Sequence, residues 1–594
     1  MSTAADPTAA PAAGGKTWFG HPAQLFWLFG TEMWERFGYY GMRALLTLYL
    51  TKHFVLGDRS STGLYGGYTA LVYLTPLVGG LLADQYLGAK RAVRFGALMM
   101  AAGYFTLAFG GPSAQPYQVI DGQRYAVVFE NYRDAPSSSP NEKRFIVAGG
   151  EKLEMRGNND GSLSLVAPDG RVARTVPAGG FTEEAERSPF FLALMLIALS
   201  LISVGNGFFK PNISTMVGEL YQQGDRRRDT GFTIFYMGIN LGSILGQTLC
   251  AIFADTIGWP AGLGIAGVAM VIAFVMISFH GGRLDAVGNR PADAGNRDAV
   301  IYLGAVLAVP LLYWLFTNLM SAAPPAEGSG FIGYLASLPL MAKLLFGTFV
   351  VAVPGILIWS ATAGNEREFQ MMLAAMTLIV FNVVFWTLFE QAGSSLALFA
   401  DRNTDRSVFG WFTISAPQTQ NFNPISIVLL APLMSALWAT LARRGLEPSI
   451  PVKFAVALMG VGGGFLFLVW GASFAGPDYK VGLWWLAGLY VIHSLAELCI
   501  SPVGLSMITK LSIARIVGLM MGVWFLSISV AQYFAGIVAQ VASVETVGGQ
   551  VTNLKVSLDA YTSTFTIVAW IAIALGVVLL GLSFPLKKWM HGVK

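Results

Sequence analysis

The stretch QLFWLFGTEMWERFGYYGMR, residues 24–43, places several charges inside an apolar segment that continues to about Thr51. At 100° per residue, its polar positions fall within an arc of about 140° on one face of a helix. These positions are Glu32, Glu35, Arg36, Tyr39, Tyr40 and Arg43. A charge at the centre of a bilayer costs roughly 2.5–3.5 kcal/mol on insertion scales. We therefore expect this face to border a hydrated pathway for an ion or a polar solute.

The composition is that of a polytopic membrane protein. Apolar residues make up 54% of the 594 residues and charged residues only 12%, whereas soluble domains carry roughly 25% charged residues. The formal net charge of +4 comes mainly from loop lysines and arginines, and we expect no nucleic-acid partner. Cys250 and Cys499 lie in apolar runs, so no disulfide framework is expected. Residues 1–20 are rich in Ala and Pro, lack a cleaved-signal pattern and are expected to be disordered.

Fourteen apolar runs are long enough to span a bilayer. An even number of spans places both termini on the same side of the membrane. The predicted spans cover residues 24–51, 61–87, 91–112, 188–219, 229–256, 261–281, 299–320, 338–361, 370–393, 422–442, 451–475, 481–509, 512–541 and 561–585.

The distribution of basic residues predicts which side holds the termini, because cytoplasmic segments carry more Lys and Arg. With both termini inside, the short outside loops hold six basic residues: Lys52, Arg59, Arg402, Arg406, Lys480 and Lys555. The inside segments hold nineteen: Lys16, Lys90, Arg91, Arg94, Arg226, Arg227, Arg228, Arg283, Arg290, Arg297, Arg367, Arg443, Arg444, Lys453, Lys510, Arg515, Lys587, Lys588 and Lys594. This asymmetry predicts cytoplasmic termini.

The connection between the third and fourth spans, residues 113–187, is unusually long. It contains strand-like runs separated by turn signals such as Asp121-Gly122, Gly149-Gly150 and Asp169-Gly170. We therefore predict a small antiparallel β module outside the cytoplasm. It could serve as a spacer, as a lobe that binds an unknown partner, or as a lid over the pathway.

The spans fall into two groups of six. We expect helices 1–6 of an N-terminal half in residues 21–112 and 188–281, and helices 7–12 of a C-terminal half in residues 370–594. Residues 282–369 are expected to be a linker that contains the two additional helices. Paired halves of this kind are typical of secondary transporters. The predicted fold class is an all-α membrane protein with a β-rich insertion.

Two motifs carry a family resemblance. Residues 79–91, GGLLADQYLGAKR, resemble the loop signature of the major facilitator superfamily, although Gln85 replaces the usual basic residue after Asp84. The pattern Glu32-x-x-Glu35-Arg36-Phe37-x-Tyr39-Tyr40 resembles the ExxERFxYY motif of the proton-dependent oligopeptide transporters, the POT or PTR family, of bacterial type. Further agreeing stretches are GNGFFKPN (205–212), FYMGINLGS (235–243), Phe385-Trp386 with Glu390-Gln391, Asn423-Pro424, Glu497-Leu498 and Ser501-Pro502.

The resemblance implies a major facilitator fold and a proton-coupled symporter that imports di- and tripeptides across a bacterial inner membrane. It implies no cofactor, with protons as the coupling ion, and lipid as the surrounding partner. The residues that match peptide-binding or pocket-lining positions of the family are Tyr40, Arg43, Tyr73, Lys210, Asn240, Trp386, Glu390, Asn423 and Glu497. The resemblance also implies two gate ion pairs, Arg43–Glu390 on the outer side and Lys210–Glu497 on the inner side.

The residues support this expectation by their chemistry. Glu32, Glu35 and Arg36 form an i, i+3, i+4 cluster in which one guanidinium cannot neutralise two carboxylates, so one carboxyl is expected to accept a proton. We accordingly assign proton coupling to these three residues and to Glu390. A static ion triad that only fixes helix packing remains open, as does the reading of each gate as a permanent structural bridge.

Other function classes are distinguishable. A related carrier could move nitrate, another small anion or a drug, but it would have less use for the acidic Glu390 and Glu497 beside the basic Arg43 and Lys210. A membrane-embedded enzyme is not expected, because the sequence has no His-Glu-x-x-His motif, no Gly-x-Ser-x-Gly motif and only five scattered histidines. A receptor or scaffold that uses residues 113–187 would bind its ligand without transporting it.

Overall fold

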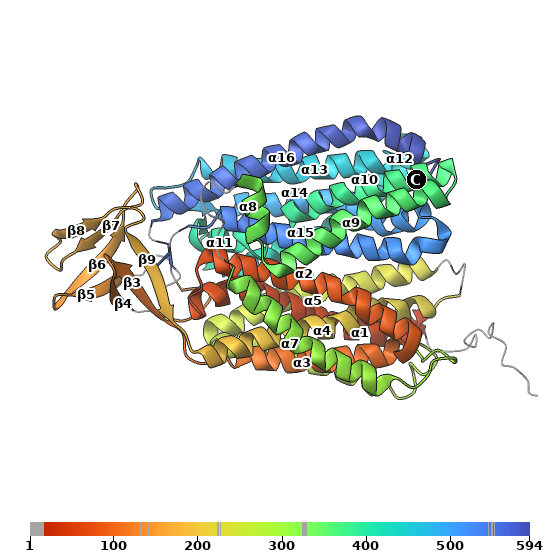
Figure 1. Ribbon diagram of the computed structural model, residues 1–594, viewed down its shortest axis with the longest axis horizontal. Helices are drawn as coiled ribbons and strands as arrows, with labels where there is room; N and C mark the ends of the chain where they lie inside the picture. The colour runs from red at the N-terminus through yellow and green to blue at the C-terminus, as the bar shows by residue number, and fades with distance from the viewer. Residues whose placement is uncertain are drawn as a thin grey trace, which may run out of the picture.

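The computed structural model describes residues 17–130, 133–138, 143–222, 225, 227–322, 330–544, 546–547, 550–551 and 553–593. Long helices form one bundle, and a β-sheet projects from one end of it (Figure 1). The predicted fold class is therefore confirmed. Most of the N-terminal segment expected to be disordered lies outside the described residues. Its last part pairs as a short hairpin, β1 (Thr17–Trp18) with β2 (His21–Pro22), so the ordered chain starts before residue 21.

Six helices form what we call the N half. Pro189 and Pro260 lie in the first turns of two of them, where the missing N–H has no intrahelical partner to lose. Two π-helical turns extend the first and second helices, η1 (Tyr49–His53) and η2 (Ala83–Leu87). The six helices are α1 (Gln24–Leu48), α2 (Asp58–Leu82), α3 (Ala89–Ala108), α4 (Pro189–Glu219), α5 (Arg227–Thr256) and α6 (Trp259–Ser278).

The C half also contains six long helices, with the short α11 (Ser395–Arg402) after the first of them. A capping box starts this first helix, because Asn365 and Glu368 each accept the other's backbone N–H. The 3-10 turns η3 (Pro417–Asn421) and η4 (Ala514–Ile516) precede two others. The long helices are α10 (Glu366–Phe389), α12 (Phe422–Arg443), α13 (Ile450–Ala472), α14 (Leu483–Leu511), α15 (Val517–Val541) and α16 (Leu554–Trp589).

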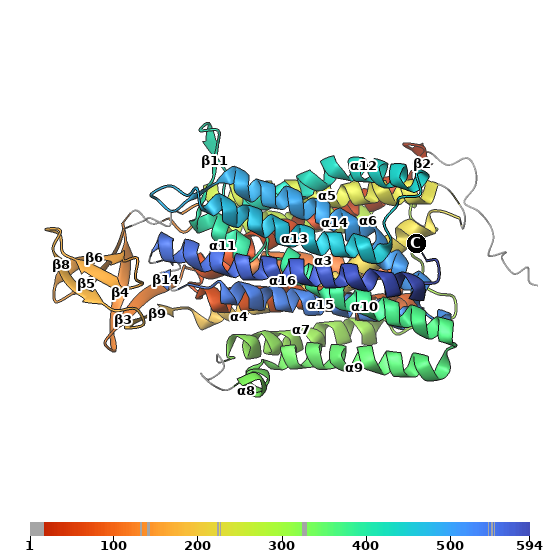
Figure 2. The same cartoon turned by 90° about the horizontal axis from the view of Figure 1, so that it is seen from above.

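Two further long helices lie between the halves in sequence and on the outside of the bundle in space. These are α7 (Asp298–Met320) and α9 (Leu340–Ala363), which Figure 2 shows beside each other along one flank, with the short α8 (Gly330–Ser337) near their connection. Helix α7 packs on α4 and α2 of the N half, whereas α9 packs on α15 and α10 of the C half.

Twelve of the described helices are long and apolar enough to cross a membrane. Helices α1 and α3 have matching lengths of 25 and 20 residues, but their charges set them apart from the other twelve. With these two, the bundle has one helix for each of the fourteen predicted spans. The sequence pattern did not indicate the short α8 and α11, because a helix of eight residues has too few turns to show a period.

The insertion is a seven-stranded antiparallel sheet with the strand order β8-β7-β6-β5-β4-β3-β9. Its apolar side chains form a core of their own, which includes Ile120, Ile146 and Val176. We call residues 113–187 the β module. Its strands are β3 (Gln115–Ile120), β4 (Gln123–Phe129), β5 (Arg144–Ala148), β6 (Glu151–Gly157), β7 (Leu163–Val166), β8 (Val172–Val176) and β9 (Phe181–Glu186).

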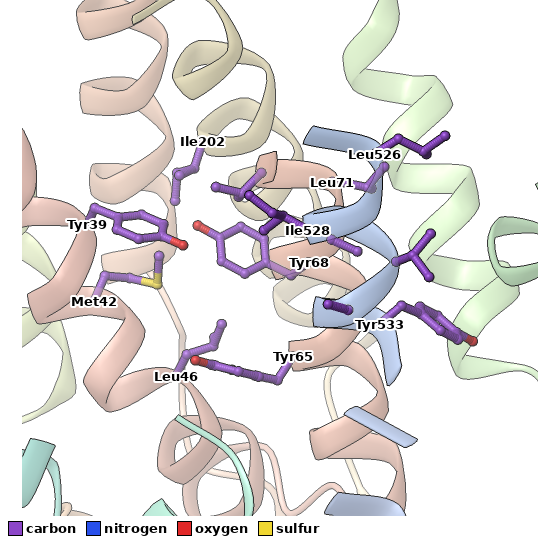
Figure 3. Packing of buried hydrophobic residues seen from close by; sticks show 14 of the residues in the cluster. Tyr39, Met42, Leu46, Tyr65, Tyr68, Leu71, Ile202, Leu526, Ile528 and Tyr533 are labelled. Atoms are coloured by element: carbon purple, nitrogen blue, oxygen red, sulfur yellow. The ribbon is translucent and has the colours of Figure 1, made fainter. Parts of the chain in front are cut away.

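The two halves meet mainly where α2 packs on α15. Figure 3 shows this contact, with Leu71 of α2 near Leu526 and Ile528 of α15. The Tyr65 and Tyr68 rings of α2 point toward Leu46 and Tyr39 of α1. Gly66 and Gly536 permit the close approach, since a Cβ built on Gly66 would lie 2.7 Å from the Cα of Gly536.

Both ends of the described chain lie at the bundle end opposite the β module (Figures 1 and 2). We call the end that carries the module the outer end and the opposite end the inner end. Short two-stranded pairs complete the outer end: β10 (Thr404–Asp405) with β13 (Val481–Gly482), β11 (Ser407–Val408) with β12 (Phe412–Thr413), and β14 (Thr546–Val547) with β15 (Gln550–Val551).

Candidate functional site

Helix α1 packs closely on α5, and this contact fixes the orientation of its polar face. Gly242 and Gly246 of α5 meet the backbone of α1 so closely that a Cβ on either would lie 2.2 Å from the carbonyl oxygens of Met33 and Phe37. Arg36 pairs with Glu35 through two hydrogen bonds, one of them 2.7 Å from Nη2 to Oε1.

Glu32 is held much less firmly than Glu35. Its Oε1 lies 3.4 Å from Arg36 Nε, and its buried Oε2 has no hydrogen-bond partner in the described part of the chain. The local geometry thus divides the two carboxyls, which the sequence spacing could not do. Glu35 is therefore the closer partner of Arg36, whereas Glu32 keeps one buried oxygen without a hydrogen-bond partner among the described residues.

A cavity of about 280 Å³ separates the two halves beside this face of α1. All nine sequence-predicted peptide-binding residues line it, together with Glu32 and Arg36, whereas Glu35 is not among the lining residues. Its volume is close to the lower end of the roughly 300–1,000 Å³ that small-molecule sites occupy. The structure therefore places the nine predicted residues around a single cavity, although they come from seven helices: α1, α2, α4, α5, α10, α12 and α14.

Among the predicted gate residues of the cavity, the two cations belong to one half and the two carboxyls to the other. The guanidinium of Arg43 on α1 and the ammonium of Lys210 on α4 belong to the N half. The carboxyls of Glu390, at the end of α10, and Glu497, on α14, belong to the C half. A solute with one cationic and one anionic end can therefore contact both walls at once.

Arg43 and Glu390 form a buried ion pair between the halves. Arg43 Nε also donates to the hydroxyl of Tyr65 at 2.5 Å. The same hydroxyl packs against Gly393, because a Cβ at that position would lie 1.8 Å from it. Tyr65 was not among the predicted site residues, since a tyrosine in an apolar run resembles ordinary core.

Lys210 and Glu497 both line the cavity, but no ion pair joins them within the described part of the chain. The Lys210 ammonium lies 4.6 Å from the centre of the Tyr73 ring. Glu497 accepts a hydrogen bond from Asn423 Nδ2 at 3.2 Å, and the same amide reaches Ser494 at 3.0 Å. Of the two predicted gate pairs, Arg43–Glu390 toward the outer end is formed in this structure. Lys210 and Glu497 do not form an ion pair among the described residues.

Several polar atoms at the cavity are buried without a hydrogen-bond partner in the described structure. They are Glu32 Oε2, Gln247 Oε1, Trp386 Nε1 and Tyr490 OH. A buried polar group without a partner costs stability, so these atoms are suited to hydrogen-bond a solute in the cavity. Gln247, Tyr490 and the neighbouring His493 were not predicted, because a single polar residue in a predicted span does not reveal which way it faces.

Two more buried ion pairs join the halves at the outer end. Lys52 Nζ lies 2.8 Å from Asp401, and Arg402 binds Asp58 through two hydrogen bonds of 2.6 and 2.7 Å. All four side chains are at most 2% exposed. Lys52 and Arg402, which were predicted in connections on the outer side, lie at the outer end in η1 and α11. Their burial and their acidic partners were not predicted, because each ion pair joins residues that are remote in sequence.

The ion pairs between the halves are thus concentrated at one end. Among the described residues, the pairs that join α1 or α2 to α10 or α11 all lie toward the outer end, and none joins the halves at the inner end. The described residues also contain no cluster of three His, Cys, Asp or Glu side chains that could hold a metal ion.

Comparisons with known proteins agree with this architecture. The chain is 29% identical to the peptide transporter YePEPT of Yersinia enterocolitica over 599 residues, which cover 98% of each protein. It is 28% identical to dipeptide and tripeptide permease A of Pectobacterium carotovorum over 568 residues, 95% of this chain and 92% of the permease.

Solved structures give the same result. A variant of peptide transporter POT in complex with alafosfalin superposes with a TM-score of 0.70 at 27% identity, covering 97% of each chain. The model of the POT family, named PTR2, matches residues 90–554. With its multi-pass helical bundle and its cavity between two halves, this chain belongs to the POT family of membrane transporters.

Proposed function

We propose that this protein is a proton-coupled symporter that imports di- and tripeptides across a bacterial inner membrane, with both termini in the cytoplasm. The observation that carries the proposal is the placement of the four predicted gate residues around one cavity, with Arg43 and Lys210 on the N half and Glu390 and Glu497 on the C half. A short peptide is a zwitterion, so its carboxylate suits Arg43 and Lys210 and its ammonium suits Glu390 and Glu497. The relatives named for peptide transport support this substrate class.

The cavity also limits the length of the substrate. An extended chain advances about 3.3–3.6 Å per residue, so charges fixed on two walls fit two or three residues and reject long peptides. Because recognition uses the two termini of the peptide, this proposal implies little selectivity for its side chains. Tyr40, Tyr73, Asn240, Trp386 and Asn423 supply the remaining lining in this proposal.

Coupling follows from competition for the same charges. A proton on Glu390 weakens its ion pair with Arg43 and favours opening toward the outer end. A bound peptide carboxylate competes with Glu497 for Lys210 and favours opening toward the inner end. Each ligand then stabilises the state that it binds best, as a ligand-driven conformational change requires. Glu32, Glu35 and Arg36 take part in proton transfer, and Glu32 is the member whose second carboxyl oxygen has no partner among the described residues.

The energy of one proton is sufficient for concentrative uptake. One elementary charge that moves through 100 mV releases about 2.3 kcal/mol. Since about 1.4 kcal/mol corresponds to a factor of ten, this supports roughly fortyfold accumulation before any pH gradient is added.

The test is uptake of labelled dialanine into liposomes that contain the purified protein. We expect accumulation above the external concentration with an inward acid gradient, and only equilibration after a protonophore collapses the gradient. Liposomes without protein serve as the control. Accumulation of dialanine to the same level with and without the proton gradient would contradict proton coupling. Gradient-driven uptake of nitrate or a drug, with no uptake of dialanine, would establish the alternative carrier.

A further inference from the structure

The β module is anchored to the N half by a short segment that we call the strap, residues 133–138. The carboxylate of Asp134 contacts His53 Nδ1 at 2.6 Å and accepts a hydrogen bond from Trp259 Nε1, also at 2.6 Å. Ser137 N donates to Asp255 at 2.7 Å. These contacts fix the strap to the outer ends of α1, α5 and α6.

The two chain connections of the module reinforce this anchor. Ala114 N donates to the carbonyl of His53 at 2.8 Å where the module begins. Arg187, where it ends, donates to the carbonyls of Phe54 and Val55, at 2.6 Å for the first. The module therefore moves with the N half in any rearrangement that separates the halves.

The same module also contacts the C half, but through few groups. Asn553, the residue before α16, donates to the carbonyl of Gly157 and to Asn159 Oδ1, both at 3.1 Å. Thr546 of β14 donates to Glu183 of β9 at 2.5 Å. Gly157 ends β6, Asn159 lies in the turn after it and Glu183 lies on β9, so two separate parts of the sheet contact the C half.

Lys52 connects the strap to the ion pairs between the halves. Its ammonium has three donors, and it lies 2.8 Å from Pro136 O, 3.2 Å from Ser138 O and 2.8 Å from Asp401 Oδ1. Two of these acceptors belong to the strap and the third to α11 of the C half. The strap therefore helps to hold the lysine that pairs with Asp401.

We infer that the β module is a brace of the outer gate, carried by the N half, which stabilises the outer-closed state through its contacts with the C half. Opening toward the outer end must break the hydrogen bonds of Thr546 and Asn553, whereas the strap contacts with Asp255 and Trp259 persist. The inference goes beyond the proposed function and rests on it only for the movement of the two halves. It differs from a spacer, which would leave the gate unaffected, and from a lid, which would move against both halves.

Crosslinking distinguishes these possibilities. One variant carries Asn159→Cys and Asn553→Cys, which link the module to the C half. The matched control carries Ser137→Cys and Asp255→Cys, which link the module to the N half. The native Cys250 and Cys499 are buried and stay in place. A short bismaleimide joins each pair, and mass spectrometry verifies the linked peptides.

We expect the first crosslink to reduce dialanine uptake at least tenfold and the control crosslink to leave it within twofold. Unchanged uptake with the first crosslink, equal inhibition by both, or failure of residues 159 and 553 to crosslink would overturn the inference. An uncrosslinked parent that carries no dialanine would refute the proposed function instead.

A second measurement does not depend on transport. Thr546→Val with Asn553→Asp removes the donors toward the module, while the introduced carboxylate retains the acceptor that caps α16. Spin labels at Ser60 and Asp559 report the separation of the halves at the outer end. We expect the population at the longer distance, relative to that at the shorter distance, to rise at least two- to tenfold, which is the effect of about one of the three lost hydrogen bonds. Thr175→Val on the remote β8 should leave this population ratio unchanged. An unchanged ratio in the double variant would overturn the inference.

Discussion

Glu32 and Glu35 illustrate how neighbouring residues of one type acquire different roles. Glu35 forms two hydrogen bonds with Arg36, whereas Glu32 approaches the same guanidinium at 3.4 Å and retains an oxygen that no described residue partners. Their spacing in sequence predicts a shared cluster but not this division. The division depends on side-chain geometry, including the placement of Arg36 near Asn206 of α4, whose Oδ1 is 3.5 Å away.

The two carboxyls give a paired prediction. Breaking a buried ion pair from one side costs roughly 3–5 kcal/mol, so Glu35→Gln should strongly lower the thermal stability of the detergent-solubilised protein. Glu32→Gln should change stability far less and should abolish gradient-driven dialanine uptake. Thermal unfolding and liposome uptake of both variants provide the measurements. Equal stability losses would contradict the assignment.

Glu390 gives a second prediction at this scale. Glu390→Gln removes the charge that pairs with Arg43 but keeps the size of the side chain. We expect the variant to lose concentrative, proton-driven uptake of dialanine while retaining exchange of labelled for unlabelled peptide. Concentrative uptake at the level of the parent would refute the coupling role of Glu390.

At the scale of helices, close packing determines which faces remain free for the cavity. Glycines of α5 seat α1 with its polar side toward the cavity, and Gly66 and Gly536 bring α2 against α15. The sequence predicted a long helix for each of the fourteen apolar runs, because a helix satisfies its backbone hydrogen bonds within one segment, and twelve of the described helices are apolar enough to span a membrane. It could not predict which helices meet, because the pairing of helices depends on surfaces that are remote in sequence.

The contact between α2 and α15 gives a prediction for the gate. A Cβ at residue 536 would lie 2.9 Å from Gly66 Cα and 3.0 Å from Thr62 O, so Gly536→Val must push the two helices apart. Overpacking of this kind typically costs about 1–3 kcal/mol, here at the contact between the halves. We expect a larger population of outer-open molecules, measured with the spin labels at Ser60 and Asp559. Gly581→Val on α16, where a Cβ would meet nothing within 4 Å, is the matched control.

At the scale of the whole molecule, the ion pairs between the halves lie toward one end. Three buried pairs join the halves toward the outer end, while Lys210 and Glu497 stand apart in the cavity. The sequence identified Arg43, Lys210, Glu390 and Glu497 because charges in apolar runs are conspicuous. It did not indicate the partners of Lys52 and Arg402 or the contacts that join module, strap and gate, because these contacts come from distant parts of the chain.

Deletion of the β module tests whether the module folds separately from the bundle and whether it stabilises the outer-closed state. Since the sheet has its own apolar core, replacing residues 114–186 by a short linker should leave a folded helical bundle that still binds dialanine. We expect slower transport, because the contacts that favour the outer-closed state are lost. Binding by calorimetry and uptake in liposomes are the measurements. Loss of all folded protein would show that the bundle depends on the module.

The projecting sheet also has a practical consequence. Most of this protein is a nearly featureless belt of helices, which particle images in electron cryomicroscopy align poorly. The seven-stranded sheet that projects from one end of the bundle makes the particle asymmetric and serves as a fiducial. It also offers an epitope for antibody fragments, and those that span the sheet and the start of α16 would report the closed state of the purified transporter.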